Sequence, residues 1–365
     1  MKSILSSEAG IIAFRKRLLA WYEDHKRSLS WRDSGDAYTI WVSEVMLQQT
    51  QVATVLNYFE RFMSTFPTVQ ELAKSDLQSV LKIWEGLGYY ARARNLHKAA
   101  QIVIKRFGGV IPDDYQEFKK LPGVGDYIAA AVMSMAYRQP YAVVDGNVKR
   151  VLSRVLLIEA PVNDAGSRTV FQTAANKLLD PLRPGDFNQA IMELGALRCR
   201  PQTPLCGQCP ITNFCAAFRE KRIADLPVTK ARSRTPTYHI AVGVVQKDGK
   251  LLITRRKEDG LLGGLWEFPG GKVESGEHVE AACIREIREE VNLDVEIVSH
   301  LTRVRHAYSH FKIIMDVFLC RYLSGEVQLQ SAVDFRWITR EEISDFPFPG
   351  ANHKFIPLLF SESSE

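Results

Sequence analysis

The spacing of apolar residues along the chain changes near residue 225. Before that point, apolar positions recur every three or four residues, as they do on the buried face of a helix. The clearest of these helical stretches are 37–66, 76–87 and 92–106, and prolines and glycines separate them. The pattern therefore predicts that the first part of the chain is helical almost throughout.

From residue 238 onward, the pattern is that of β-strands. Short and mostly apolar runs are separated by polar turns, and they cover 239–246, 250–256, 313–322 and 335–339. Lys247, Asp248 and Gly249 fit a hairpin turn, and one clear helix is predicted over 279–291. This order of elements predicts an all-α domain followed by an α/β domain.

The stretch between these two patterns is polar, basic and flanked by prolines, so it reads as a linker. We expect a helical domain over 1–224, a linker over 225–237 and a second domain over 238–365. A length of 365 residues agrees with two or three domains.

Composition places the chain among soluble globular proteins, with 46% apolar and 24% charged residues. No apolar run approaches the length of a membrane span. The N-terminal stretch reads as an amphipathic helix and lacks the features of a signal peptide. We expect a cytoplasmic monomer.

Charge is distributed unevenly along the chain. Residues 1–230 contain 30 Lys and Arg against 22 Asp and Glu, a net charge of +8, and residues 231–365 contain 17 against 20, a net charge of −3. Basic side chains release counterions from DNA, so the first part suits a polyanionic partner.

Two motifs in the helical part carry candidate chemistry. The sequence Leu-Pro-Gly-Val-Gly places Gly123 and Gly125 in a hairpin before a helix that begins near Tyr127, where outward-facing amides suit a phosphate. About 20 residues later, Asp145 opens another helix; the simpler alternative is a glycine turn followed by an N-cap.

Glu44 is a carboxylate on a helix whose other positions are largely apolar. Burial there would raise its pKa and make it a proton donor near neutral pH. The alternative is a surface glutamate on an amphipathic helix.

Together, these motifs resemble those of the MutY-type adenine DNA glycosylases, members of the helix-hairpin-helix glycosylase superfamily. The resemblance covers residues 12–222 and depends on the segments 43–52, 86–96, 121–125 and 144–152 and on a cysteine cluster. It implies a two-carboxylate reaction in which Glu44 protonates the adenine, Asp145 stabilises the C1′ cation and Asn147 orients the sugar or water. Tyr127 stands where bifunctional relatives such as endonuclease III carry a Schiff-base lysine, which implies a monofunctional enzyme.

The resemblance also assigns contacts with DNA. The target base must be flipped out of the duplex, and Gln49, Leu87 and Tyr89 match the family's DNA-contacting positions. Arg32 and Gln189 match residues that line the adenine pocket.

Four of the six cysteines lie within 17 residues, at Cys199, Cys206, Cys209 and Cys215. Their spacing suits either structural Zn²⁺ or a [4Fe–4S] cluster. The resemblance favours the [4Fe–4S] cluster.

The second domain carries a nearly complete Nudix box, in which only the last glycine is replaced, by Asn292. Asparagine tolerates the left-handed conformation at a helix C-terminus, so we expect the turn to be kept. Glu286, Glu289 and Glu290 share one helical face and could bind Mg²⁺.

This domain resembles the MutT-like domain of MutY proteins, which in that family recognises 8-oxoguanine opposite adenine. Tyr308, Ser309 and His310 match the family's Phe-Ser-His loop, with Tyr in place of Phe. The expected function is excision of adenine from A:8-oxoG and A:G mispairs in duplex DNA. Because the Nudix box is intact, a Mg²⁺-dependent hydrolase of oxidised nucleotides is the alternative for this domain.

Overall fold

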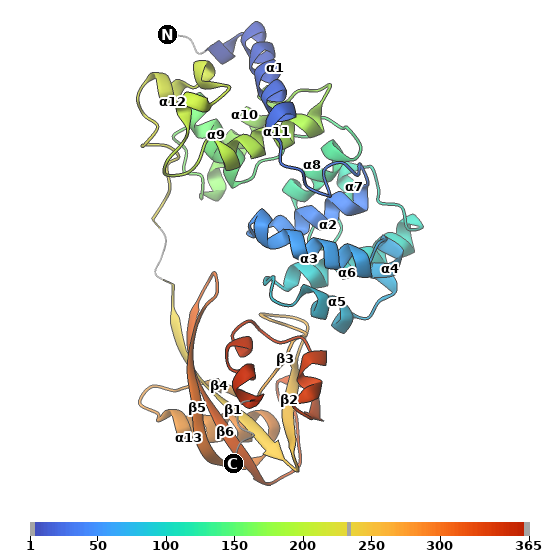
Figure 1. Ribbon diagram of the computed structural model, residues 1–365, viewed down its shortest axis with the longest axis vertical. Coiled ribbons are helices and arrows are strands. Elements are labelled where there is room, and N and C mark those ends of the chain that lie inside the picture. Colours follow the sequence, from blue (N-terminus) through green and yellow to red (C-terminus); the bar gives the residue numbers. More distant parts are fainter. Residues whose placement is uncertain (1–3, 232–234, 361–365) are drawn as a thin grey trace. The chain divides into compact units, whose positions relative to one another are not determined.

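The computed structural model describes residues 4–231 and 235–360 and divides the chain into two compact units (Figure 1). The first unit comprises Met1–Gln70 and Lys98–Arg232, and the second comprises Glu71–His97 and Ser233–Glu365. A segment from the helical half of the sequence therefore groups with the C-terminal part. The boundaries at 224 and 238 stay a prediction, and residues 232–234 of the expected linker lie outside the described residues.

Helices make up the described chain as far as residue 231, as the apolar period predicts. They are α1 (Glu8–His25), α2 (Ala37–Leu47), α3 (Val52–Thr65), α4 (Val69–Lys74), α5 (Leu77–Trp84), α6 (Ala91–Phe107), α7 (Tyr115–Lys119), α8 (Asp126–Met135), α9 (Gly146–Leu156), α10 (Arg168–Leu178), α11 (Pro184–Leu197) and α12 (Ala216–Arg219). Aspartate side chains start four of them by accepting a hydrogen bond from the amide three residues later, at Asp36, Asp76, Asp114 and Asp145.

The prediction of one continuous helix over 37–66 is wrong. The helix ends at Leu47 and a new one begins at Val52, and Gln49 between them has a left-handed backbone with φ 56°. The apolar period continues through the break, and no glycine or proline marks it, so the sequence pattern could not show it.

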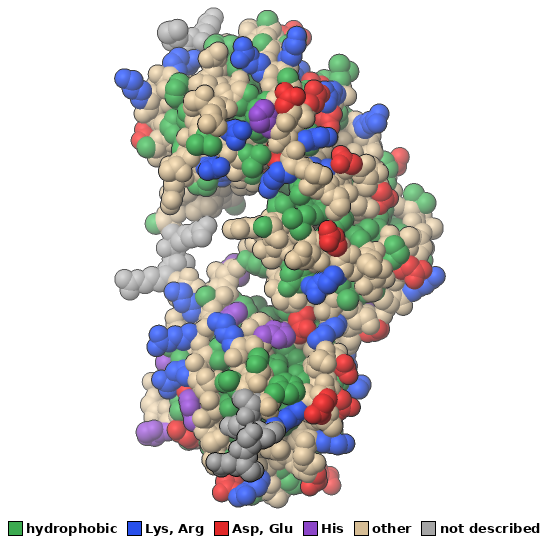
Figure 2. All heavy atoms as spheres, viewed as in Figure 1, with side chains coloured by type: hydrophobic (Ala, Val, Ile, Leu, Met, Phe, Trp, Pro, Cys, Tyr) green, Lys and Arg blue, Asp and Glu red, His purple; other side chains and the backbone are tan. Residues whose placement is uncertain are grey.

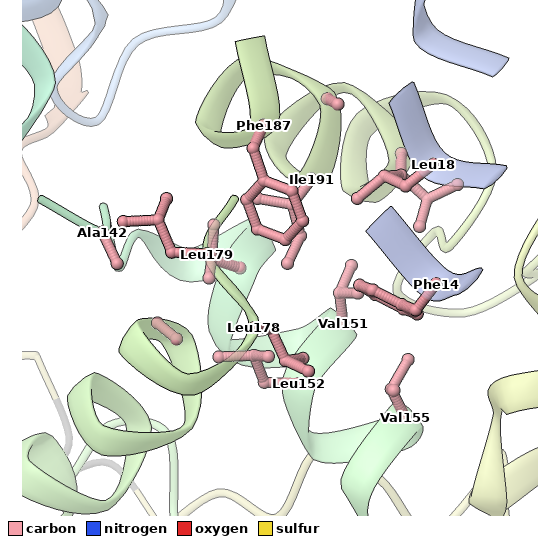
Figure 3. Close-up of a cluster of buried hydrophobic side chains, with 14 of the residues drawn as sticks. Phe14, Leu18, Ala142, Val151, Leu152, Val155, Leu178, Leu179, Phe187 and Ile191 are labelled. Carbon is pink, nitrogen blue, oxygen red and sulfur yellow. The ribbon is translucent and has the colours of Figure 1, made fainter. Parts of the chain in front are cut away.

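Helix α9 packs in the centre of the first unit's core, where it is surrounded by α1, α10 and α11 (Figure 3). The Phe14 and Phe187 rings lie 6.3 Å apart between their centroids. The side chains of this core that Figure 3 labels are Phe14, Leu18, Ala142, Val151, Leu152, Val155, Leu178, Leu179, Phe187 and Ile191. This packing fixes the start of α9, and with it Asp145.

A mixed sheet forms most of the second unit. Its strands are β1 (Thr237–Lys247), β2 (Lys250–Arg256), β3 (Trp266–Glu267), β4 (Gly270–Lys272), β5 (Asp294–Ala307), β6 (Lys312–Ser324) and β7 (Ala332–Ile338). The order is β3-β2-β1-β6-β5, with β4 paired to β1 and β7 to β2, and only β1 and β6 run parallel. An α/β domain was predicted, and the structure confirms it.

Strand β1 is buried on both faces, which explains its nearly continuous apolar run. Ala241 and Val245 face helix α13 (Val279–Val291), whereas Val242 and Val244 face the cluster that contains Phe348. The bounds of α13 and β2 are those that the sequence predicts.

Strand β5 was not predicted, because most of its side chains are exposed or only partly buried and give no alternation. Within the described residues, no helix is long and apolar enough to cross a membrane.

Replacing Phe187 by alanine should leave a cavity in the core of the first unit. We expect Phe187→Ala to lower the free energy of unfolding by about 3–5 kcal/mol, measured by urea denaturation. Val170→Ala, at a side chain on α10 that is 46% exposed, is the matched control and should change stability little. Equal effects of the two substitutions would contradict this picture of the core.

Candidate functional site

The Glu44 carboxyl lies in the interior of the first unit, and only 5% of the residue is exposed. Its Oε2 accepts a hydrogen bond from the Tyr127 hydroxyl at 2.6 Å. Burial raises the pKa of Glu44 to about 7; the Tyr127 hydrogen bond and the charge of Arg32 oppose the shift, and the charge of Asp145 adds to it. The site thus holds a carboxylic acid that exchanges its proton near neutral pH.

Tyr127 reaches Glu44 from the first turn of α8. Burial raises the pKa of its phenol, and the negative charges of Glu44 and Asp145 raise it further, so the hydroxyl keeps its proton. Met192 Sδ lies 3.4 Å from the same oxygen. Tyr127 therefore acts here as a hydrogen-bond donor to the carboxylate.

Asp145 is the N-cap of α9, and both of its oxygens are engaged. Oδ1 accepts from the Val148 amide at 2.7 Å, and Oδ2 accepts from Asn147 Nδ2 at 2.9 Å. Burial raises the pKa of Asp145, while these two hydrogen bonds and the charge of Arg150 act in the opposite direction. Arg150 also donates to Asn147 Oδ1 at 2.8 Å, which fixes the asparagine amide.

The two residues expected to line an adenine pocket are each bound to a neighbour. Arg32 Nη2 donates to Glu193 Oε2 at 2.7 Å, and Gln189 Oε1 accepts from the Tyr22 hydroxyl at 3.0 Å. Arg27 Nη2 donates to the same Glu193 oxygen at 2.6 Å. These side chains form a polar cluster. Its residue Arg32 carries the charge that lowers the pKa of Glu44.

The sequence analysis missed Glu193. In the structure, its side chain is only 1% exposed. In the sequence it follows apolar residues near the end of α11, and nothing there shows that it meets two arginines. Burial alone would raise its pKa, but hydrogen bonds from Arg27 and Arg32 lower the pKa to about 2.

The hairpin before α8 agrees only in part with expectation. Gly123 has φ +77°, whereas Gly125 has φ −90° and ψ −180°, an extended conformation open to any residue. Gly125 therefore does not adopt the left-handed conformation that favours glycine. Gly125 is the N-cap of α8, and a Cβ there would meet nothing within 4 Å, so its backbone is open to a close approach.

The three residues expected to contact the DNA stack differ in exposure. Gln49 in the first unit and Tyr89 in the second are exposed, and both have left-handed backbones, with φ 56° and 50°. Such strain in non-glycine residues is often found at functional sites. Leu87 is only 5% exposed, so its predicted contact with DNA would need it to move.

The four clustered cysteines line one cavity, together with Arg154 and Arg198. Arg154 is 2% exposed and donates to the carbonyls of Arg200 and Pro201 at 2.7 Å, and its Nη1 lies 3.4 Å from Cys199 Sγ. Among the described residues, no three His, Cys, Asp or Glu side chains are placed to hold a single metal ion. Four thiols around one cavity, with cationic neighbours, fit a larger thiolate-bound cluster.

The acidic face of α13 is engaged by neighbouring groups. Arg285 Nη1 donates to Glu286 at 2.9 Å and to Glu289 at 3.0 Å, and Glu290 Oε2 accepts from the Gly270 amide at 3.1 Å. Burial raises the pKa of Glu290 to about 7. The helix ends at Asn292 with φ 56°, which confirms the expected left-handed turn.

The segment from Tyr308 to His310 connects β5 and β6. The Tyr308 ring stacks on Phe311 with 4.7 Å between centroids, and burial raises its pKa to about 12. Ser309 and His310 are exposed, and the Ser309 hydroxyl hydrogen-bonds the Tyr89 hydroxyl. The aromatic residue therefore packs, and the two polar residues are accessible.

Basic side chains are spread over the face shown in Figure 2, with acidic side chains among them in both units. On this face, the basic side chains therefore do not form one concentrated patch.

Two family descriptions match the chain. Residues 42–172 match "HhH-GPD superfamily base excision DNA repair protein", and residues 241–358 match "NUDIX domain". Adenine DNA glycosylase of Rattus norvegicus is 38% identical over 93% of this chain and 76% of its own length. The Homo sapiens enzyme is 38% identical over 92% of this chain and 71% of its own length. The Schizosaccharomyces pombe enzyme is 33% identical over 90% of this chain and 86% of its own length. The chain belongs to the adenine DNA glycosylase family.

Solved structures agree with this membership. A thermostable thymine-DNA glycosylase is 27% identical, with a TM-score of 0.53 over 57% of this chain and 97% of its own. An endonuclease III–DNA covalent intermediate has a TM-score of 0.51 over 59% of this chain and 98% of its own, and at 23% identity it shows the fold alone. This member of the adenine DNA glycosylase family is accordingly a DNA glycosylase enzyme with a helical N-terminal fold and a C-terminal Nudix domain.

The low pKa of Glu193 makes the stability of this glycosylase depend on pH. A carboxyl whose pKa falls from an ordinary 4.5 to about 2 on folding stabilises the folded state above pH 4.5, and this contribution is lost as the pH falls toward 2. We expect Glu193→Gln to lower the free energy of unfolding by about 3 kcal/mol at pH 7. Urea denaturation should show the difference from wild type narrowing below pH 4.5.

The exposed ion pair of Glu23 with Arg183 provides the control, because Glu23→Gln should change stability little at any pH. A difference between wild type and Glu193→Gln that stays constant from pH 7 to pH 3 would refute the assignment of the low pKa to Glu193.

Proposed function

We propose that this chain removes adenine from A:8-oxoG and A:G mispairs in duplex DNA, by flipping the adenine out and hydrolysing its N-glycosidic bond. The observation that carries the proposal is the pairing of Glu44, an acid with a pKa of about 7, with Asp145 in the same interior site. Two carboxyl groups with different environments suit the cleavage of a glycosidic bond.

Glu44 is the proposed general acid. Its raised pKa leaves a large protonated fraction at neutral pH, and the carboxyl can give that proton to the adenine as the bond breaks. The Tyr127 hydroxyl then donates to the carboxylate that remains, which stabilises the charged product form of Glu44.

Asp145 is the proposed stabiliser of the positive charge that develops at C1′. Its two hydrogen bonds, from Val148 and Asn147, favour its ionised form and fix its orientation. Asn147 is held in turn by Arg150 and so can also orient the sugar or the attacking water.

The enzyme is proposed to be monofunctional, leaving an abasic site. At the position of a Schiff-base lysine the chain has Tyr127, which is occupied with Glu44. The nearest lysine in sequence to Asp145 is Lys149, and its Nζ is engaged by the Val162 carbonyl at 2.8 Å.

DNA contacts are proposed at three places. The hairpin with Gly123 and Gly125 would bind a backbone phosphate at the start of α8. Gln49 and Tyr89, with Leu87 beside Tyr89, would fill the space that the flipped base leaves. Arg32, which donates to Glu193, and Gln189, which accepts from Tyr22, would line the adenine pocket.

A [4Fe–4S] cluster is proposed in the cavity lined by Cys199, Cys206, Cys209 and Cys215. Such a cluster supplies four iron–thiolate bonds that would fix this loop. Arg154 binds the backbone on one side of the cavity, and Arg150 donates to the Cys199 carbonyl at 2.8 Å. The chain's own contacts therefore connect the cysteine loop to α9, whose N-cap is Asp145.

Lesion reading is proposed for Ser309 and His310, whose exposed polar groups can bond the altered edge of 8-oxoguanine, with Tyr308 packed as their support. The proposed partner is duplex DNA, which the protein would bind as a monomer.

The intact acidic helix supports a second candidate for the Nudix domain, Mg²⁺-dependent hydrolysis of oxidised nucleotides, through Glu286, Glu289 and Glu290.

Glu44→Gln should reduce adenine excision about 10²- to 10⁴-fold, since an amide cannot donate the proton. Single-turnover kinetics on an A:8-oxoG duplex measure the rate, and gel shift or anisotropy should show nearly unchanged binding. In wild type, the rate should fall as the pH rises above about 7, because the protonated form of Glu44 is the reactive one. Glu117→Gln, on the exposed face of α7, is the control. Normal excision by Glu44→Gln would refute the acid role.

Replacing both Ser309 and His310 by alanine should reduce the preference for A:8-oxoG over A:G by about 1–3 kcal/mol, the scale of a lost base contact. Excision from A:G should change less. Glu289→Gln serves as the control from the same unit and should leave both rates as they are. A double variant with full lesion preference would place the reader elsewhere in the chain.

A further inference from the structure

One carboxylate joins the end of α5 to the C-terminal segment of the second unit. The Glu85 side chain is only 14% exposed, and both of its oxygens are engaged. Oε1 accepts from the Phe348 amide at 2.7 Å and lies 3.0 Å from His353 Nε2, while Oε2 accepts from Lys82 Nζ at 2.6 Å. Glu85 therefore connects residues that are more than 250 positions apart in sequence.

Phe348 is held through both of its backbone polar groups by the same stretch of chain. Its amide donates to Glu85, and its carbonyl accepts from the Tyr90 hydroxyl at 3.3 Å. The Phe348 ring is buried and stacks on Phe268, with centroids 5.6 Å apart. Lys82 Nζ also donates to the Phe346 carbonyl at 3.1 Å. The attachment thus reaches the core of the sheet.

The charge on Glu85 is part of this attachment. Burial alone would raise the pKa of its carboxyl, but hydrogen bonds from His353, Lys82 and the Phe348 amide outweigh burial and hold the pKa below its ordinary value. A glutamine could still accept the Phe348 hydrogen bond, but it would lose the ionic contact with Lys82. A comparison of wild type with Glu85→Gln therefore isolates the ionic contact with Lys82 from the hydrogen bond with Phe348.

Immediately after Glu85 comes a segment with an unusual backbone. Gly86, Gly88 and Tyr89 have φ values of +91°, +77° and 50°. A left-handed non-glycine residue persists only where its surroundings fix it. Glu85 is the C-cap of α5, the last residue before this segment, and Tyr89 within it hydrogen-bonds Ser309.

We infer that Glu85 is a positioning residue for lesion discrimination, which fixes residues 86–90 against the part of the second unit that carries Ser309 and His310. The inference rests on the proposed reading of 8-oxoguanine by those two residues. Glu85 belongs to the second unit, whereas Glu44 and Asp145 belong to the first, so its loss should leave the hydrogen bonds of Glu44 and Asp145 intact.

Single-turnover excision from A:8-oxoG and A:G duplexes tests this inference. Glu85→Gln should reduce the ratio of the A:8-oxoG rate to the A:G rate about 5- to 30-fold. The control is Glu296→Gln, which removes an exposed ion pair with Arg321 on the same sheet and should keep the ratio. A purely structural role of Glu85 would lower stability and leave the ratio as it is, which would overturn the inference.

Amide hydrogen exchange of the free protein provides a readout that does not depend on the lesion. Glu85→Gln should speed exchange in residues 86–90 and 346–353, and Glu296→Gln should not. If wild type itself shows no preference for A:8-oxoG, the proposed lesion reading by Ser309 and His310 fails, and the exchange rates still decide whether Glu85 positions residues 86–90. Unchanged exchange in Glu85→Gln would overturn the positioning role.

His353→Gln removes the partner of Glu85 in the contact between His353 and Glu85. This variant replaces Glu85→Gln in the test if Glu85→Gln fails to fold. If both residues act through one contact, the double variant should discriminate about as well as Glu85→Gln alone. Additive losses of discrimination would show that the two residues act separately and would contradict the inference.

Discussion

The site depends on keeping one carboxyl group out of water. Glu44 is buried on α2, and burial is the largest cause of its raised pKa. The surrounding residues limit the effect without cancelling it, because the Tyr127 hydroxyl and Arg32 favour the ionised form. An acid without those neighbours would hold its proton too firmly, and an exposed one would have lost it at neutral pH.

Asp145 shows how a local folding signal and a proposed catalytic group can be the same residue. As an N-cap it satisfies an amide of α9, and in doing so it fixes the direction of its own carboxylate. The two readings of this residue drawn from the sequence, an N-cap and a reactive group, are therefore compatible. The core around α9 supplies the rigidity that both require.

The sequence predicts those features that depend on local patterns. Apolar spacing located α13 and β2, and the tolerance of asparagine for a left-handed turn predicted the end of α13 at Asn292. The break at Gln49 was not predictable, because tertiary packing fixes a backbone that its residue type does not favour. Glu193 was missed for a related reason, since only the fold shows that two distant arginines meet it.

The second unit is assembled from two stretches, Glu71–His97 and Ser233–Glu365, that lie far apart in the chain. A discontinuous unit cannot be separated from its neighbour by a single cut. Cleavage at the linker would leave Gln78, Lys82 and Glu85 on one fragment and their partners Trp266, Phe346 and Phe348 on the other. The Nudix domain of this protein is therefore not an interchangeable module, and evolution or engineering that exchanged it would have to change α5 as well.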